Sequence, residues 1–373
     1  MNWIDTVAAA NSASRLRTDL AARYPAFSPA RLKEMVVVGA AAEGERICRI
    51  ADSQGLRVLA VVDDDPVKIG RAMSGGAKVY PAISDDIDLE TPVVIASHRV
   101  LNATLRLRGK GRRNVIGFGV LQTIDPQRFP PHSFYARWLE DIVENSARYL
   151  EAFALLADER SRAIFAAILG YRISGDITEL QPYVDQSLFY PKELFNFGKH
   201  EVYIDGGCYT GDTIDLFIEH TANCFDRIVG FEPDPANFSV LAKRFAGDQR
   251  VEPKQLGLWR DKRTLRFAAS HDRAAGLSAE GDVEVQVSSI DEELRGDRVT
   301  FIKMNIEGAE LDALEGGRRT ISKWKPKLCV SGYHEASHLW EVPLLIKQIC
   351  PDHKIYLRQH DGGVIESTYY GVA

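Results

Sequence analysis

The stretch Glu201-Val-Tyr-Ile-Asp-Gly-Gly-Cys-Tyr-Thr-Gly-Asp-Thr213 decides the fold of the region around it. A run of β-forming residues ends at Asp205, three glycines follow within six residues, and an amphipathic segment begins at Thr213. This order predicts a strand, a tight glycine-rich turn and a helix. Such a turn lets the backbone approach a ligand closely, and the helix N-terminus adds free N–H groups.

Acidic residues beside this turn indicate the kind of ligand. Asp205 and Asp212 favour a guest with an amine and hydroxyls over a bare phosphate. The next predicted strand, residues 227–231, is followed by Glu232, which lies 27 residues after Asp205. An acid about 20 residues or more past a glycine-rich turn is placed to bind both ribose hydroxyls of an adenine nucleoside. An adenosine ligand without a pyrophosphate, such as S-adenosylmethionine, fits these residues.

Length and composition bound the class of protein. The chain has 373 residues, enough for two hydrophobic cores, and is 45% hydrophobic and 26% charged. Its net charge of −6 gives no electrostatic footprint for nucleic acid. Five cysteines without a Cys-x-x-Cys pair indicate a reducing compartment and no zinc or disulfide framework. Because no apolar run approaches the roughly 18 residues of a membrane span, we expect a cytoplasmic protein that binds neither nucleic acid nor a membrane.

The pattern of apolar residues predicts an α/β protein with two Rossmann-like, doubly wound domains joined by a helical linker. Residues 1–33 form a helical arm that serves packing or contact with a second copy in a homo-oligomer. Residues 34–130 form the first α/β domain, and residues 131–200 the helical linker and cap. The main domain covers residues 201–373. Within it we predict a hairpin from residues 264–267 and 283–287, and a helix that begins near Glu307.

The first domain repeats the plan of strand, glycine turn, helix, strand and acid. Its turn runs from Gly39 to Gly44 and lacks the middle glycine of the dinucleotide fingerprint, and Asp63 ends the next strand. The run Val62-Asp-Asp-Asp-Pro-Val-Lys-Ile-Gly70 resembles small Rossmann-like modules at the N-termini of sugar-modifying and acyl-transferring enzymes of glycan pathways. Two interpretations stay open: a structural or partner-binding module without a ligand, and a nucleotide or nucleotide-sugar site.

Four blocks of the main domain carry a more specific resemblance. They are residues 202–213, residues 231–237, Phe301-Ile-Lys-Met-Asn-Ile-Glu-Gly-Ala-Glu310, and Val330-Ser-Gly-Tyr-His334 with residues 339–346. In this order they resemble the signature blocks of FkbM-type methyltransferases, over about residues 183–373. The resemblance implies a class I methyltransferase fold, S-adenosylmethionine as the cofactor, and O-methylation of sugars, polyketides or related small molecules.

The resemblance also implies a set of residues around the cofactor. Asp205 lies near the methionine amine, or it only caps the loop; Asp212 holds the amine, or it caps the helix. Glu232 binds the ribose diol, whereas Tyr209 lines the methionine portion or packs outward. The complete predicted set is Asp205, Gly206, Gly207, Tyr209, Gly211, Asp212, Thr213, Glu232, Pro233, Asn237 and Asn305.

The catalytic candidates follow the later strands. Asn305 stands where the family usually has Asp, and an amide cannot act as a base. Glu307 is then a candidate base, or a charge that stabilises a helix N-terminus. His334 is the other candidate base, or a loop hydrogen-bonding residue. Lys303 is predicted to help position the substrate, and Glu310 to be a supporting or surface residue.

No metal site is predicted. Asn305 makes a hard-cation site less favourable, and the spacing of the later histidines, His338, His353 and His360, does not suggest ligation by one another. We therefore expect an S-adenosylmethionine-dependent O-methyltransferase that acts on a small-molecule or glycan acceptor. N-methylation is one alternative, and a non-catalytic scaffold whose first domain binds a partner or nucleotide sugar is another. A nucleotide-sugar oxidoreductase is disfavoured because no Tyr-x-x-x-Lys pair accompanies the incomplete fingerprint.

Overall fold

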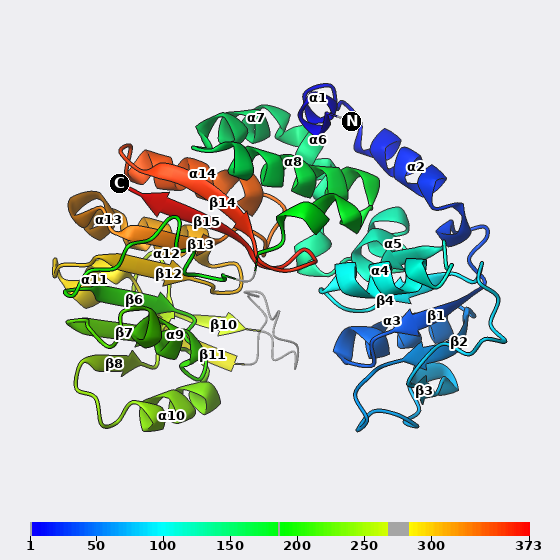
Figure 1. Ribbon diagram of the computed structural model, residues 1–373, viewed down its shortest axis with the longest axis horizontal. Helices are drawn as coiled ribbons and strands as arrows, with labels where there is room; N and C mark the ends of the chain where they lie inside the picture. Colours follow the sequence, from blue (N-terminus) through cyan, green and yellow to red (C-terminus); the bar gives the residue numbers. More distant parts are fainter. Residues whose placement is uncertain (1, 186, 268–282) are drawn as a thin grey trace. The chain divides into compact units, whose positions relative to one another are not determined.

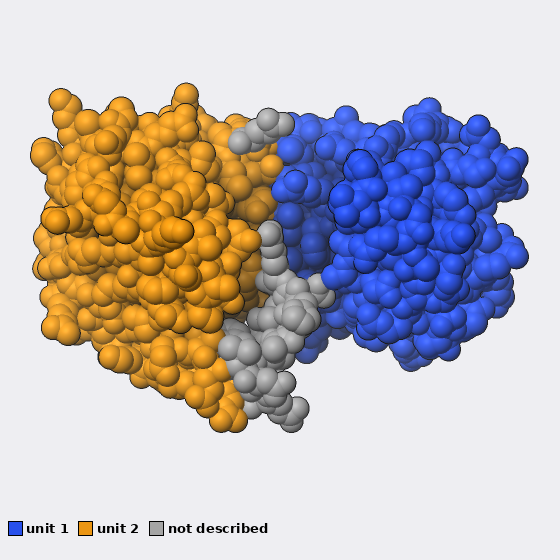
Figure 2. All heavy atoms as spheres, turned by 90° about the horizontal axis from the view of Figure 1, so that it is seen from below, with its two compact units in different colours: residues 1–150, 163–184, 361–365 blue, residues 151–162, 185–360, 366–373 orange. Residues whose placement is uncertain are grey.

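The computed structural model describes residues 2–185, 187–267 and 283–373, and the chain forms two compact units. Unit 1 consists of residues 1–150, 163–184 and 361–365, and unit 2 of residues 151–162, 185–360 and 366–373 (Figure 2). Residues 131–200, for which a linker and cap was predicted, are therefore shared between the two units. No helix of the described segments is long and apolar enough to cross a membrane.

Unit 1 contains a five-stranded, all-parallel sheet with the strand order β3-β2-β1-β4-β5 (Figure 1). The strands are valine-rich and largely buried, as expected for a parallel sheet covered by crossover helices. The strand bounds are β1 (Glu34–Val38), β2 (Arg57–Val62), β3 (Val79–Tyr80), β4 (Val93–Ile95) and β5 (Val115–Gly117).

The helices of unit 1 include the predicted N-terminal arm. Trp3 in this arm is buried and donates a hydrogen bond from Nε1 to Glu179 Oε2 (3.2 Å) within the same unit. The elements are α1 (Trp3–Ala8), α2 (Ala13–Arg23), η1 (Pro25–Phe27), α3 (Ala42–Ser53), η2 (Ser74–Gly76), α4 (Val100–Gly109), α5 (Phe118–Ile124), η3 (Ser133–Tyr135), α6 (Trp138–Glu144) and η4 (Ile177–Tyr183). The chain passes from one unit to the other within α7 (Ser146–Leu155) and α8 (Glu159–Ser174).

Unit 2 contains a seven-stranded sheet with the order β14-β15-β13-β12-β6-β7-β8. All neighbours pair in parallel except β15, which is antiparallel to both β13 and β14. This arrangement confirms the predicted α/β class and the Rossmann-like fold. The bounds are β6 (Val202–Gly206), β7 (Arg227–Phe231), β8 (Val251–Lys254), β12 (Phe301–Met304), β13 (Lys327–Ser331), β14 (Lys354–Gln359) and β15 (Ser367–Val372).

A second, smaller sheet of unit 2 has the order β10-β11-β9. It contains the predicted hairpin, since β10 and β11 pair antiparallel. Its strands are β9 (Gly257–Leu258), β10 (Arg263–Phe267) and β11 (Val283–Ser288). The helices of unit 2 after β6 are α9 (Asp212–His220), α10 (Pro235–Arg244), α11 (Ile290–Leu294), α12 (Glu310–Gly316), α13 (Arg318–Trp324) and α14 (His338–Ile349).

An aromatic core supports the central strands of unit 2. Tyr203 on β6 stacks on Phe217 of α9 and on Phe301 of β12, with ring centroids 4.4 and 4.9 Å apart. Tyr190 and Phe195, from the irregular segment before β6, pack on the same cluster, and His220 stacks on Tyr190. These aromatic side chains therefore belong to the core, which fixes β6 and α9 on either side of the glycine loop.

Candidate functional site

The carboxyl ends of β6, β7, β12 and β13 meet at one edge of the unit 2 sheet, where ligands of doubly wound folds bind. Asp205, near the end of β6, is fully buried. One oxygen of its carboxylate, Oδ1, lies 3.0 Å from Lys303 Nζ, and the other, Oδ2, accepts a hydrogen bond from Thr213 Oγ1 (2.5 Å). Both oxygens of Asp205 are thus engaged inside the domain, and Thr213 serves Asp205 through its side chain.

Lys303 lies opposite Asp205 in the register of β12 and β6. Its ammonium group also donates to the carbonyl oxygens of Gly206 (3.1 Å) and Gly207 (2.9 Å). Burial alone would lower the pKa of Lys303, but the charge and hydrogen bond of Asp205 outweigh it and raise that pKa. Because all three N–H donors are used within β6 and its loop, we assign Lys303 to bracing the loop.

The glycine loop itself has no room for side chains at two positions. Gly207 has a φ of +72°, and a Cβ atom there would lie 2.1 Å from the carbonyl oxygen of Asn305. Gly211 has a φ of +96°, and its Cβ would lie 2.4 Å from Phe245 Cε2. Tyr209, between them, adopts a φ of +52° and leaves 43% of its surface exposed. The loop backbone is therefore held in one conformation that presents Tyr209 to solvent.

Glu232 joins the end of β7 to this loop. Its Oε2 accepts a hydrogen bond from the Tyr209 backbone N–H (2.9 Å), and its Oε1 accepts one from the Asp234 N–H (3.0 Å). The residue is only 6% exposed, and burial raises its pKa although these N–H groups and the Asn237 side chain lower it. Within the described ranges, no lysine or arginine forms an ion pair with Glu232.

The remaining predicted cofactor residues lie on either side of Glu232 and the loop. Asp234 caps α10 by accepting hydrogen bonds from the N–H groups of Ala236 (2.9 Å) and Asn237 (2.8 Å), which is ordinary cap chemistry. Asn237 and Pro233 are half-buried, whereas Asp212 is exposed at the start of α9. The structure thus brings together the glycine loop, Glu232 and Asn237, and it leaves Asp212 on the surface.

A second cluster follows β12 and β13. The predicted helix near Glu307 begins three residues later, at Glu310, because Glu307 (φ +55°) and Gly308 (φ +106°) form a left-handed turn. The Glu307 side chain is 47% exposed, and its Oε2 lies 3.8 Å from His334 Nε2. Asn305 Oδ1 accepts a hydrogen bond from Tyr333 Oη (3.3 Å). Asn305, Glu307 and His334 are therefore neighbours at the sheet edge.

Glu310 is fully buried beside His334, which excludes the surface alternative and agrees with the predicted supporting role. Its Oε1 lies 2.9 Å from His334 Nδ1, and its Oε2 lies 3.6 Å from His338 Nδ1. Burial opposes ionisation, but the two histidines and a backbone N–H outweigh it and lower the pKa of Glu310 to about 2. For His334 burial lowers the pKa, whereas Glu310 and Glu307 raise it, and the net direction is upward.

Glu310 and His338 were not among the predicted site residues. The four-residue spacing of His334 and His338 is the sequence signal that could have placed His338 in the same site as His334. Donor atoms of Glu310, His334 and His338 lie within 4.8 Å of one another, whereas no metal site was predicted from the sequence.

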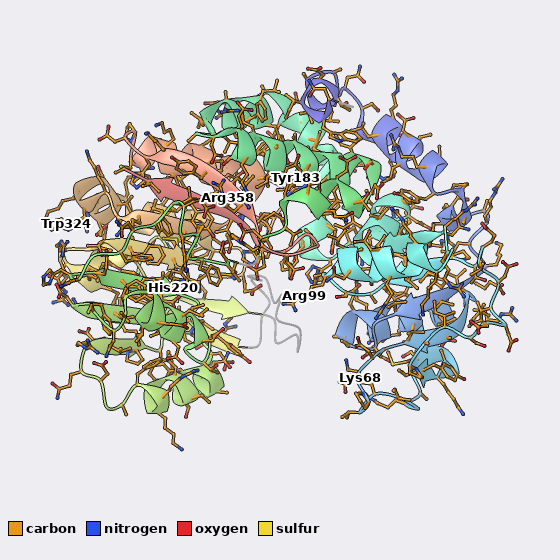
Figure 3. The ribbon with its side chains drawn as sticks, viewed as in Figure 1. Lys68, Arg99, Tyr183, His220, Trp324 and Arg358 are labelled. Atoms are coloured by element: carbon orange, nitrogen blue, oxygen red, sulfur yellow. The ribbon has the colours of Figure 1, made fainter. Side chains whose placement is uncertain are left out.

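The glycine turn of unit 1 has an acid in the corresponding position. Asp63 Oδ2 accepts a hydrogen bond from the Ala40 N–H (2.7 Å), and Oδ1 accepts one from the Asp65 N–H (3.0 Å). Lys68, in the loop after β2, lies 3.2 Å from the same carboxylate (Figure 3). Burial would raise the pKa of Asp63, but the two N–H groups and Lys68 lower it. This acid is thus satisfied by its own loop and a neighbouring cation.

Comparisons with known proteins find a family match within unit 2. Residues 205–357 match the family model of the methyltransferase FkbM domain. The chain resembles the crystal structure of methyltransferase FkbM from Methylobacillus flagellatus KT, with a TM-score of 0.74 and 23% identity, over 99% of this chain and 97% of that chain. At this identity the likeness shows the fold. No significant match was found among curated proteins.

More distant structures also align. Fibrillarin from Aeropyrum pernix, in complex with natively bound S-adenosyl-L-methionine, aligns with a TM-score of 0.32 and 12% identity, over 48% of this chain and 71% of that chain. An rRNA methylase from Streptococcus thermophilus aligns with a TM-score of 0.30 and 12% identity, over 46% and 85%. These scores are too low to carry an argument. From the family match, the chain contains an FkbM methyltransferase domain at residues 205–357.

Proposed function

We propose that this chain transfers the methyl group of S-adenosylmethionine to a hydroxyl group of a small-molecule or glycan acceptor. The main support for this cofactor is the environment of Glu232. Its carboxylate is buried, has no cationic partner among the described residues, and is hydrogen-bonded to the loop that follows β6. A carboxylate offers about four lone-pair sites, and the backbone uses two of them. The remaining capacity, shared with Asn237, suits the hydroxyl donors of a ribose.

The glycine loop fits the same cofactor. The absence of a side chain at Gly207 lets the loop pack against the Asn305 carbonyl, and Tyr209 is exposed in the same loop. When bound, S-adenosylmethionine supplies an electrophilic methyl group, so the protein has to align the acceptor and remove its proton. Asn305 cannot remove a proton, whereas His334 and Glu307 are side by side at the sheet edge.

We assign the role of base to His334, with Glu307 as the neighbouring group that orients the acceptor. The imidazole can accept a proton near neutral pH. Glu307 is half-exposed and flanks Nε2, so it offers a hydrogen-bond acceptor to a second hydroxyl of a polyol. The preference for a sugar or glycan rests on that pairing and on the sequence resemblance of the first domain. The acidic net charge of −6 argues against a nucleic-acid acceptor.

The test is a methyl-transfer screen with labelled S-adenosylmethionine against nucleotide sugars, free sugars and glycan extracts. We expect label in a sugar ether with the wild type and a loss of about 100-fold or more in kcat with His334→Ala, because general base catalysis typically contributes 10²–10⁴-fold. His200→Ala is the matched control, since that histidine of unit 2 is highly exposed and pairs with Asp226. Near-normal turnover of His334→Ala would remove this histidine from the mechanism.

A further inference from the structure

The Glu310 carboxylate, at the first residue of α12, is surrounded by hydrogen-bond donors. Oε1 accepts from the Ile306 backbone N–H (2.8 Å), and Oε2 accepts from the Gly308 N–H (3.1 Å). Each oxygen also faces one histidine: His334 Nδ1 on Oε1 at 2.9 Å, and His338 Nδ1 on Oε2 at 3.6 Å. Three nitrogen atoms thus lie within 3.1 Å of this carboxylate, and His338 Nδ1 lies just beyond hydrogen-bond distance.

Two of these three nitrogen atoms belong to the turn that carries Glu307. Glu310 therefore holds the backbone of residues 306–308 and the ring of His334 through the same carboxylate. With 0% exposure for Glu310 and 2% for His334, neither side chain has room to rotate away. The relative position of Glu307 and His334 follows from this shared anchor.

The anchor also selects between the two nitrogens of His334. Nδ1 faces an ionised carboxylate that can only accept hydrogen bonds, so Nδ1 carries the hydrogen of the neutral ring. Nε2 is then the unprotonated nitrogen, and it points to Glu307, whose side chain is about half exposed. The basic lone pair of His334 is thereby directed to Glu307, although Nε2 itself is buried.

We propose that Glu310 is a positioning residue that holds His334 in the Nδ1–H tautomer, so that Nε2 is the atom that takes the proton of the acceptor. This inference rests on the proposed function for its catalytic meaning. As the acceptor oxygen bonds to the methyl carbon, its O–H proton passes to Nε2, and the carbon–sulfur bond breaks with its electron pair left on sulfur. The resulting imidazolium charge lies against Glu310, while the backbone N–H groups of Ile306 and Gly308 keep the carboxylate in place.

A bound cation is the rival explanation of the same residues. Two histidines and a glutamate are a donor set that Zn²⁺ accepts, and the donor atoms lie within 4.8 Å of one another. Each Glu310 oxygen, however, already accepts a backbone N–H group. A cation would have to share both oxygens with these amides or displace a histidine, so we favour the hydrogen-bonded network and include the cation as an outcome of the test.

The first measurement is made on the wild-type protein and needs no methyl acceptor. Histidine ¹⁵N and ¹³C NMR of the full-length protein at a pH where His334 is neutral reports which ring nitrogen is protonated, with His334→Asn to assign the signal. We expect the Nδ1–H tautomer to dominate. A dominant Nε2–H tautomer would overturn the proposal, whatever the protein methylates.

The second measurement uses Glu310→Gln, with Glu315→Gln as the matched control on the same helix, where Glu315 pairs with Arg318 instead. In Glu310→Gln we expect the Nδ1–H preference to disappear and the proton affinity of His334 to fall about tenfold, to a degree limited by Glu307 and Glu366, which also raise its pKa. The control should leave both unchanged. An unchanged tautomer in Glu310→Gln would contradict the positioning role.

Two further experiments distinguish a failure of this proposal from a failure of the proposed function. Titration with Zn²⁺ alone by calorimetry should show no stoichiometric tight site; one equivalent that is lost in His338→Ala would replace the proposal with a cation site. Once an acceptor is known, Glu310→Gln should lower kcat and move the acidic limb of its pH profile to lower pH. If no acceptor is ever methylated but the tautomer is as expected, the proposed function fails and the positioning by Glu310 stands.

Discussion

The two glycine turns of the molecule, one in each unit, have similar backbone contacts, but the acids beside them have different partners. In both, a glycine with positive φ packs against a carbonyl of the neighbouring strand end: Gly39 against Ala96, and Gly207 against Asn305. In both, the acid after the next strand accepts a backbone N–H of the turn: Asp63 from Ala40, and Glu232 from Tyr209. The difference lies in what else the acid meets.

Asp63 has Lys68 beside it, whereas Glu232 has no cation among the described residues. The pKa values shift accordingly: that of Asp63 is lowered and that of Glu232 is raised. An acid that already pairs with a cation of its own loop has little remaining capacity to bind a ligand. A buried acid without a cation is stabilised by a ligand that brings hydrogen-bond donors. The comparison therefore favours unit 2 as the nucleoside site and unit 1 as a module whose turn is structurally closed.

The largest expected effect is on the buried pair under the unit 2 turn. Asp205→Ala leaves the Lys303 charge buried and unpaired, and we expect the free energy of unfolding to fall by about 3–5 kcal/mol. Guanidinium unfolding followed by tryptophan fluorescence and far-UV circular dichroism measures it. The double variant Asp205→Ala with Lys303→Met should recover part of the loss; a single-variant loss below about 1 kcal/mol would show that this brace is unnecessary.

The next largest effect is on S-adenosylmethionine binding, which we expect to depend on the unit 2 turn and not on the unit 1 turn. Glu232→Ala should weaken S-adenosylmethionine binding by about 3 kcal/mol, roughly a hundredfold, because two hydrogen bonds to a charged carboxylate are lost. Asp63→Ala, the matched change in unit 1, should leave that affinity unchanged. Titration calorimetry compares them, and an equal loss in both variants, or none in Glu232→Ala, would break the distinction between the turns.

The smallest effect concerns the cation of the unit 1 turn. Since the folded pKa of Asp63 is depressed, its stabilising contribution is present above the ordinary aspartate pKa and is lost as the pH falls through the folded value. Lys68→Met raises that folded pKa, so the loss should begin at a higher pH, with at most about 1 kcal/mol at neutral pH. Thermal unfolding between pH 3 and 7 tests this. Arg57→Met, which breaks the exposed pair with Glu34, is the control and should show a smaller pH dependence.

Local sequence was enough to predict the parts that local chemistry determines. The β-formers before Asp205 and the glycines after it correspond to β6 and to the start of α9 at Asp212. The alternating residues 283–287 pair with 264–267 as predicted, because a period of two places one face of each strand against the same neighbour. The spacing from Asp205 to Glu232 also located the acid that binds the loop.

The contacts of Lys303, Glu310 and His338 could not be predicted, because they depend on strand order and on the direction of side chains. Lys303 faces Asp205 only because β12 lies next to β6 in that register, which no local pattern reveals. Glu310 appeared peripheral because the helix was expected to start at Glu307, whereas the left-handed turn moves the start and directs Glu310 inward. His338 meets the same carboxylate because α14 and α12 pack together, so its role followed from tertiary contact alone.

The position of β15 has a consequence for how this chain is made. Residues 361–365 belong to unit 1 and residues 366–373 to unit 2, where β15 separates β13 from β14 in the sheet. A ribosome that has synthesised residue 360 has therefore produced neither unit in full, and β13 still has an open edge awaiting its neighbour. Strand edges of this kind attract other chains. The nascent polypeptide must keep that edge covered until β15 has been synthesised, because the unit 2 sheet closes only when residues 367–372 have been added.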